Sequence, residues 1–121
     1  MEKMHDIAYS AIDQIPPSQR LRQEDREVIV RNKENLLALG PYIVKSFYDT
    51  LYDHPPTAAV FHAGERHDRE GTLVNWWSRT VNGPLDDDYF AWMALVGLVH
   101  VMRNVTNPMM LVMSDHVALI V

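Results

Sequence analysis

The chain has 121 residues, which is the size of a single domain. Hydrophobic residues make up 47% and charged residues 22%, the usage of an ordered soluble domain, so this composition argues against disorder. A formal net charge of −5 disfavours a nucleic-acid partner, and the absence of cysteine excludes disulfides and thiolate metal sites.

Apolar residues recur at spacings of three and four between the prolines and glycines, and this pattern predicts helices rather than strands. In chain order, we expect helices at 4–15, 21–39, 41–52, 72–81, 89–102 and 109–121, with one further turn at 57–61. The polar segment 64–71 leads into the helix expected at 72–81. The acidic run 86–88 is typical of a helix start, because acids there complement the helix dipole. The sequence therefore predicts an all-α domain of about six helices.

His100 is the most informative residue, because it lies within the predicted apolar helix at 89–102. A helix that is apolar nearly all round is buried, and burying an imidazole without a partner costs on the order of 1–3 kcal/mol. His100 therefore needs either a hydrogen-bond acceptor, such as a carbonyl or an acid, or a metal ion. A structural zinc site is not favoured, because the chain has no cysteine and no histidine four residues from His100. Gly97 would let a flat group approach the same side of the helix.

Three aromatic residues are candidates to face His100 across a pocket. Tyr48 shares a helical stripe with Val44 and Leu51, so its phenol points toward the core, as a packing residue or as part of a pocket. Trp76 and Trp77 are adjacent and point in different directions, so at least one of them lines the core.

Three segments taken together carry a family pattern. Phe47 precedes Tyr48 in the stretch 47–55, Trp77 lies within 73–83, and Gly97 stands three residues before His100 in a segment that begins at Leu85 and is followed by Pro108. These segments resemble the haem-binding globin domain of bacterial globin-coupled sensors, the family that includes the protoglobins. The resemblance covers roughly residues 21–121 and implies a globin-like fold.

The resemblance also implies a site. His100 would be the proximal ligand of the iron of haem b, and Tyr48 the distal residue that hydrogen-bonds bound oxygen. Neutral imidazole on Fe(II) leaves the sixth position open for O2, CO or NO, and a phenol stabilises the partial charge of bound O2. Arg79 and Arg103 are plausible cations for the haem propionates, and His67 is an alternative sixth ligand. The other pocket residues implied are Phe47, Leu73, Val74, Trp77, Val96 and Met110.

By the same resemblance, residues 1–20 form an N-terminal extension helix and residues 21–121 a globin-like sensor domain. The final globin helix is expected to be missing or supplied by another chain. The apolar end Val117–Val121 would then have nothing of its own chain to cover it. We therefore expect a homodimer or another oligomer, with the signalling output in a further domain or protein.

Three functions remain open from the sequence. The first is a haem-based sensor of diatomic gas, O2 or also NO or CO, which is not an enzyme by itself. The second is a haem-less globin-like signalling or interaction module, and the third is a globin with NO dioxygenase activity that uses external electrons, since no nicotinamide or flavin fingerprint is present. Ser114, Asp115 and His116 are consecutive and cannot form a hydrolytic triad.

The chain has no apolar stretch long enough to span a bilayer and no secretory signal pattern at its start. The sequence thus predicts a cytoplasmic protein without a membrane or nucleic-acid partner.

Overall fold

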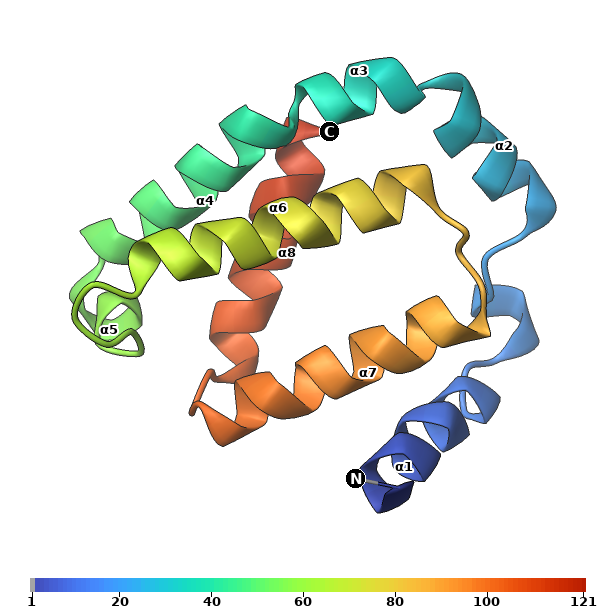
Figure 1. Ribbon diagram of the computed structural model, residues 1–121, viewed down its shortest axis with the longest axis horizontal. Helices are drawn as coiled ribbons and strands as arrows, with labels where there is room; N and C mark the ends of the chain where they lie inside the picture. Colours follow the sequence, from blue (N-terminus) through green and yellow to red (C-terminus); the bar gives the residue numbers. More distant parts are fainter. Residues whose placement is uncertain (1) are drawn as a thin grey trace.

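A computed structural model describes residues 2–121, with side chains from residue 6 onward, and every regular element in this part of the chain is a helix (Figure 1). The predicted all-α class is therefore confirmed. Met4, expected on the apolar face of the first helix, lies outside the described side chains. In chain order the elements are α1 (Glu2–Asp13), a 3₁₀ turn (Pro17–Gln19), α2 (Gln23–Arg31), α3 (Lys33–Ala38), α4 (Gly40–Asp53), α5 (Pro55–Ala58), α6 (Arg66–Asn82), α7 (Asp87–Met102) and α8 (Asn107–Ile120).

The single helix predicted at 21–39 is wrong, because the chain breaks it at Asn32 into α2 and α3. Asn32 has φ −105° and ψ 11°, outside the helical region. Its side-chain amide donates to the Val28 carbonyl at 2.7 Å, a local bond that competes with the helical ladder. The amphipathic pattern continues across the break, which is why periodicity alone does not reveal it.

Helix α6 begins earlier than the apolar pattern indicates. It includes the polar segment from Arg66 onward, where ion pairs one turn apart support a solvent-facing helix. The guanidinium of Arg66 lies 3.7 Å from the carboxylate of Glu70, and Arg69 lies 3.7 Å from Glu65. The extension matters because it includes Arg69, which lines the cavity described below.

Both ends of α7 are capped by side-chain or main-chain bonds. Asp86 accepts a hydrogen bond from the Tyr89 N–H at 3.0 Å, which confirms the acidic start expected from the sequence. At the other end Asn104 adopts the left-handed conformation (φ 62°), and the Val105 N–H donates back to the His100 carbonyl at 3.0 Å. This is the Schellman arrangement of a helix C-terminus, and it fixes where the chain turns into α8.

Figure 1 shows how the helices are arranged. Helix α4 packs on α6 and contacts α8, and α8 crosses behind α6 in the view of Figure 1. Helix α1 packs along the opposite side of α7. The buried side chains form three groups, one around Val44, Tyr48, Leu51 and Met113, one around Ala8, Ile12 and Ala91, and one around Ile43, Trp77 and Val81.

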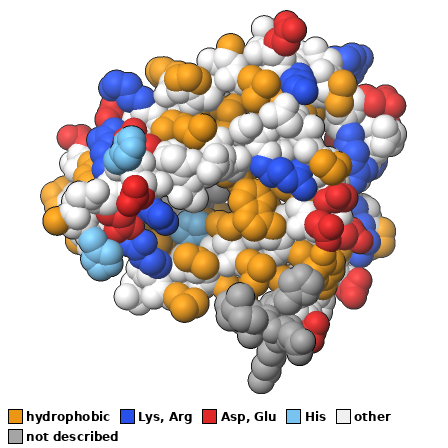
Figure 2. All heavy atoms as spheres, viewed as in Figure 1, with side chains coloured by type: hydrophobic (Ala, Val, Ile, Leu, Met, Phe, Trp, Pro, Cys, Tyr) orange, Lys and Arg blue, Asp and Glu red, His pale blue; other side chains and the backbone are white. Residues whose placement is uncertain are grey.

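Hydrophobic atoms gather between α6 and α7 on the face that Figure 2 shows, and charged side chains gather at the two ends of this strip. In the described part of the chain, each helix is too short or too polar to cross a membrane.

Candidate functional site

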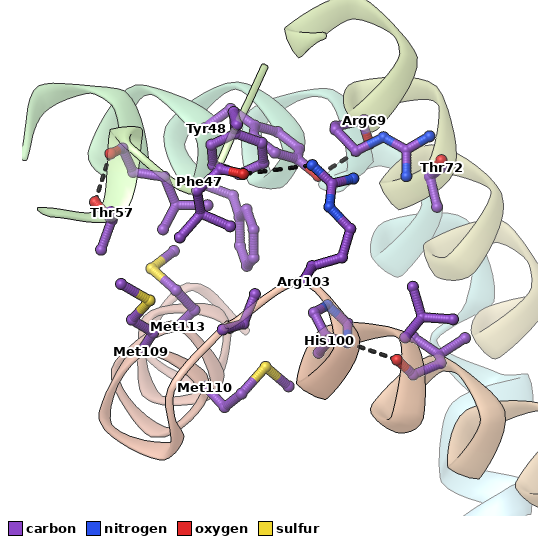
Figure 3. Close-up of a pocket in the computed structure, with 16 residues that line it drawn as sticks. Phe47, Tyr48, Thr57, Arg69, Thr72, His100, Arg103, Met109, Met110 and Met113 are labelled. Atoms are coloured by element: carbon purple, nitrogen blue, oxygen red, sulfur yellow. Dashed lines mark hydrogen bonds between the residues drawn. The ribbon is translucent and has the colours of Figure 1, made fainter. Parts of the chain in front are cut away.

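A cavity of about 310 Å³ lies between α4, α6, α7 and the start of α8 (Figure 3). This volume is at the lower end of the range found for small-molecule sites, about 300–1,000 Å³. The walls are mainly aliphatic, aromatic and methionine side chains, and the charged residues that line it are both arginines. The lining residues are Phe47, Tyr48, Leu51, Thr57, Val60, Phe61, Arg69, Thr72, Val96, Val99, His100, Arg103, Val105, Met109, Met110 and Met113.

His100 lies on the α7 wall of the cavity, half-buried, with its ring held by the helix itself. Its Nδ1 lies 2.7 Å from the carbonyl oxygen of Val96. A carbonyl can only accept, so Nδ1 carries the proton and, in the neutral ring, Nε2 keeps its lone pair. Among the described residues no group hydrogen-bonds Nε2. The same bond would satisfy a core histidine and would orient a metal ligand, because ligating histidines usually donate their other ring N–H to a carbonyl or carboxylate.

Tyr48 lies across the cavity from His100, on α4 (Figure 3). Its hydroxyl donates to the Arg69 carbonyl of α6 at 3.0 Å, and the ring packs edge-on against Phe47 and Phe61. Burial raises the pKa of the Tyr48 phenol to about 12, so the hydroxyl stays protonated and remains a donor at neutral pH. The predicted position of Tyr48 in the core is confirmed.

Arg103 follows the end of α7, lines the cavity and reaches Glu65 just before the start of α6 (Figure 3). Its Nη1 lies 2.6 Å from Oε1 of Glu65, and its Nη2 donates to Oε2 at 2.8 Å. Oε2 also accepts the His62 N–H at 2.9 Å. These donors hold the pKa of Glu65 down to about 2, chiefly through the hydrogen bond from Arg103.

Of the residues implied for the pocket by the family resemblance, the structure brings together Phe47, Tyr48, Val96, His100 and Met110. It places Leu73, Val74 and Trp77 outside the lining of the cavity. Leu73 packs against the core group of Tyr48, and Val74 is exposed. Trp77 is buried in the group of Ile43 and Val81 and donates its indole N–H to the Leu36 carbonyl at 2.7 Å.

The structure separates the two arginines considered for propionates. Arg103 lines the cavity, whereas Arg79 lies near the other end of α6, where its Nη1 donates to the Pro84 carbonyl at 2.5 Å and its guanidinium stacks over Tyr89. His67, the alternative sixth ligand, is exposed and does not line the cavity.

Sequence reasoning missed Arg69 and Thr72, which line the cavity from α6. The signal for Arg69 was available, because Glu65 and Arg69 are four residues apart and so predict a helical turn within the polar segment. Nothing in the pattern showed that the inner face of this turn contacts the cavity.

The fold and the cavity together define a globin: an all-helical domain in which a histidine from one helix and a tyrosine from another face each other across an apolar pocket. The family model described as Protoglobin matches residues 9–120, so the chain belongs to the protoglobin family. Neither the search of curated proteins nor the search of solved structures gave a match.

A haem is the prosthetic group that this family implies, and the residues around the cavity fit one. The walls are mainly apolar, as a porphyrin requires, and one imidazole nitrogen of His100 has no partner among the side chains that the structure describes. Within residues whose side chains are described, no group of three or more His, Asp or Glu could hold a metal ion by itself. A single imidazole is sufficient when a porphyrin supplies the remaining nitrogens.

Proposed function

We propose that this protein is a haem-based sensor of diatomic gas, in which His100 coordinates the iron of haem b and Tyr48 faces the gas ligand. The observation that carries the proposal is the protonation pattern of His100: Nδ1–H is committed to Val96 and Nε2 is free at an apolar cavity. Haem supplies an open coordination position at which O2, NO or CO binds reversibly. Binding and transmission, rather than turnover, are the proposed role of the domain.

Val96 sets the direction of the His100 ring. A hydrogen bond from Nδ1 to a carbonyl one turn earlier keeps the imidazole plane along the helix and favours the neutral tautomer that can donate a lone pair. Because the ring is hydrogen-bonded to the Val96 carbonyl, a movement of the ring along the direction of Nε2 would also displace the main chain of α7.

The hydroxyl of Tyr48 has one proton, and in this structure it donates that proton to the main-chain carbonyl of Arg69. To donate to a gas ligand, the phenol must release the Arg69 carbonyl. This exchange costs little, because the Arg69 carbonyl oxygen has two lone pairs and belongs to a helix. When the phenol leaves, the oxygen can still accept the main-chain hydrogen bond of the helix. Ligands that accept a hydrogen bond would thereby be favoured over ligands that do not.

Helix α7 connects the pocket to α1. Val96 and His100 face the cavity, whereas Ala91 lies in the buried group of Ala8 and Ile12 of α1. We propose that displacement of α7 on ligand binding is transmitted to α1 and to α8, which follows α7 after a short turn. The output partner would respond to these helices.

The test is a haem titration followed by absorption spectroscopy under argon, CO and O2. The protein is expected to bind one haem and to form a CO complex typical of histidine-ligated iron. His100→Gly is expected to lose these spectra and to regain them with added imidazole. His116→Ala is the matched control, since His116 is also a half-buried helical histidine but hydrogen-bonds Ser46 at 3.0 Å, away from the cavity. A folded protein that takes up no haem would overturn the proposal and would favour a haem-less interaction module, because both His100 and Tyr48 are satisfied by main-chain carbonyls.

A further inference from the structure

A series of hydrogen bonds and one ion pair connects His100 of α7 to Tyr48 of α4. It begins at the end of α7, where the main-chain N–H of Arg103 donates to the His100 carbonyl at 3.2 Å. From there the Arg103 guanidinium reaches Glu65, with Nη1 2.6 Å from Oε1 and Nη2 donating to Oε2 at 2.8 Å. The helix that carries His100 is therefore tied to the N-cap residue of α6.

The series continues along the first turn of α6. The main-chain N–H of Arg69 donates to the Glu65 carbonyl at 3.1 Å, and the Arg69 carbonyl accepts the Tyr48 hydroxyl at 3.0 Å. The carbonyl that Tyr48 has to release before it can donate to a ligand thus belongs to the turn that Glu65 starts. Because a helical turn has a fixed rise and a fixed pattern of hydrogen bonds, the position of Glu65 sets the position of this carbonyl.

The Glu65 carboxylate is held firmly, because its partners come from two elements. Oε2 accepts the His62 N–H at 2.9 Å as well as the bond from Arg103, and the Glu65 side chain is only 11% exposed. An ion pair with two close N···O contacts and little exposure is more rigid than a pair of solvated charges. Nε of Arg69 lies 3.7 Å from the same carboxylate, so Arg103 rather than Arg69 determines where Glu65 sits.

We propose that Glu65 is a positioning residue for Tyr48: it holds the Arg69 carbonyl against the phenol and so limits donation of the hydroxyl to a bound gas ligand. The inference rests on the proposed function, because it gives Glu65 a part in the choice among gas ligands. Displacement of α7 acts on the same series of contacts through Arg103, shifts the Arg69 carbonyl and releases the hydroxyl. The two walls of the cavity are thereby coupled through the protein as well as through the ligand.

Glu65→Gln tests the proposal in the haem-loaded protein. The amide can still accept the His62 N–H but lacks the charge that attracts Arg103, so the Arg69 carbonyl is held less firmly. We expect O2 to dissociate about threefold more slowly, because Tyr48 donates to it more readily, and the rate of CO dissociation to stay within about 1.5-fold of the wild type. Stopped-flow displacement of each gas measures both rates. A merely structural role would change the two rates together.

The effect has to pass through the phenol. In the Tyr48→Phe background, Glu65→Gln is therefore expected to leave O2 dissociation unchanged. Glu70→Gln is the matched control, because Glu70 is an acid of the same helix, lies 3.7 Å from Nε of Arg66 and is outside the lining of the cavity. Its rate of O2 dissociation should equal that of the wild type.

A measurement without haem separates the inference from the proposed function. Urea unfolding of the haem-free wild type, Glu65→Gln, Tyr48→Phe and the double variant forms a thermodynamic cycle. Because both residues act on the Arg69 carbonyl, Tyr48→Phe should destabilise the Glu65→Gln protein less than the wild type, by about threefold in the unfolding equilibrium constant. The same cycle with Glu70→Gln should show no coupling.

Each outcome decides one of the two proposals. If haem does not bind but the cycle shows coupling, the haem function is overturned and the hold of Glu65 on the Arg69 carbonyl stands. If haem binds and Glu65→Gln leaves O2 dissociation unchanged, accelerates it, or changes it equally in the Tyr48→Phe background, the positioning role is overturned and the haem function stands. A cycle in which the two substitutions are additive also overturns the positioning role.

Discussion

His100 and Tyr48 face each other across the cavity, and each donates its proton to a main-chain carbonyl within the protein. Neither side chain therefore leaves an unsatisfied polar group when the cavity holds no ligand. His100 and Tyr48 differ in whether they can bind a ligand without giving up a hydrogen bond. His100 retains a free lone pair on Nε2, whereas Tyr48 has to exchange one acceptor for another before it can donate to a ligand.

Replacing Tyr48 tests that exchange. In Tyr48→Phe the ring packing remains but the hydroxyl donor is lost, so O2 is expected to dissociate about 3–10 times faster, the effect of about one hydrogen bond. CO dissociation should change little, because CO is a poor acceptor. Stopped-flow displacement of each gas from the haem-loaded protein measures both rates, and equal acceleration of both would contradict a hydrogen-bonding role.

The Glu65–Arg103 pair gives a pH dependence whose sign can be worked out. The pKa of Glu65 is lowered from its usual 4.5 to about 2 in the folded protein. Its contribution to stability is therefore fully present above about pH 4.5 and is lost as the pH falls toward 2. The difference in thermal midpoint between the wild type and Glu65→Gln should shrink between pH 5 and pH 2, as measured by circular dichroism. A difference that stays constant over this range would contradict the ion pair.

At the scale of elements, the bounds of helices with a strong apolar stripe could be predicted from the sequence. The bounds of the polar helices could be predicted only in part. Helix α4 is observed at Gly40–Asp53 against a predicted 41–52, because proline and glycine mark its start. The start of α6 was missed because ion pairs one turn apart, rather than apolar spacing, stabilise it. The break at Asn32 depends on one side-chain bond that leaves the apolar spacing intact.

In the candidate site, too, some residues could be predicted from the sequence and others could not. Tyr48 could be placed because its helical stripe is buried, and His100 because its hydrogen bond lies within its own helix. Trp77 is as apolar as a pocket residue, but whether its face of α6 meets the cavity or α3 depends on the angle between helices. That angle is set by tertiary contacts such as Gly40, where an added Cβ would lie 3.1 Å from the Trp77 ring.

Trp77 is accordingly expected to act on stability rather than on the pocket. Trp77→Phe leaves the Leu36 carbonyl of α3 without its indole donor, and we expect a loss of about 1–3 kcal/mol of unfolding free energy. Haem affinity and gas dissociation rates should stay within about twofold, because a contact outside the pocket wall changes neither the iron ligand nor the donor. Urea unfolding and the haem titration measure the two effects. Val74→Ala, an exposed change on the same helix, is the control.

At the scale of the whole molecule, large apolar side chains are exposed on the last part of α7 and along α8. They are Val101, Met102, Leu111, Val112, Leu119 and Val121. Apolar surface of this extent is typical of protein interfaces, and we propose that a second copy of the chain covers it.

The proposed dimer can be tested by charge. Leu111→Asp combined with Leu119→Asp is expected to convert the dimer to a monomer, because a buried unpaired carboxylate at an interface is strongly unfavourable. Light scattering coupled to size-exclusion chromatography gives the mass in each case. Val30→Asp, an equally exposed apolar position on α2, should leave the mass unchanged. A wild-type protein that is monomeric at high concentration would contradict the proposal.

Helix α7 packs on one side against Ala8 and Ile12 of α1 and borders the cavity on the other. An occupant of the cavity would thus give this helix a second solid neighbour and would stabilise it. Amide protons near His100 should then exchange with deuterium more slowly once the pigment is loaded. In such a molecule, the cell's supply of haem would govern not only whether the protein can respond to gas but also how long it survives proteolysis.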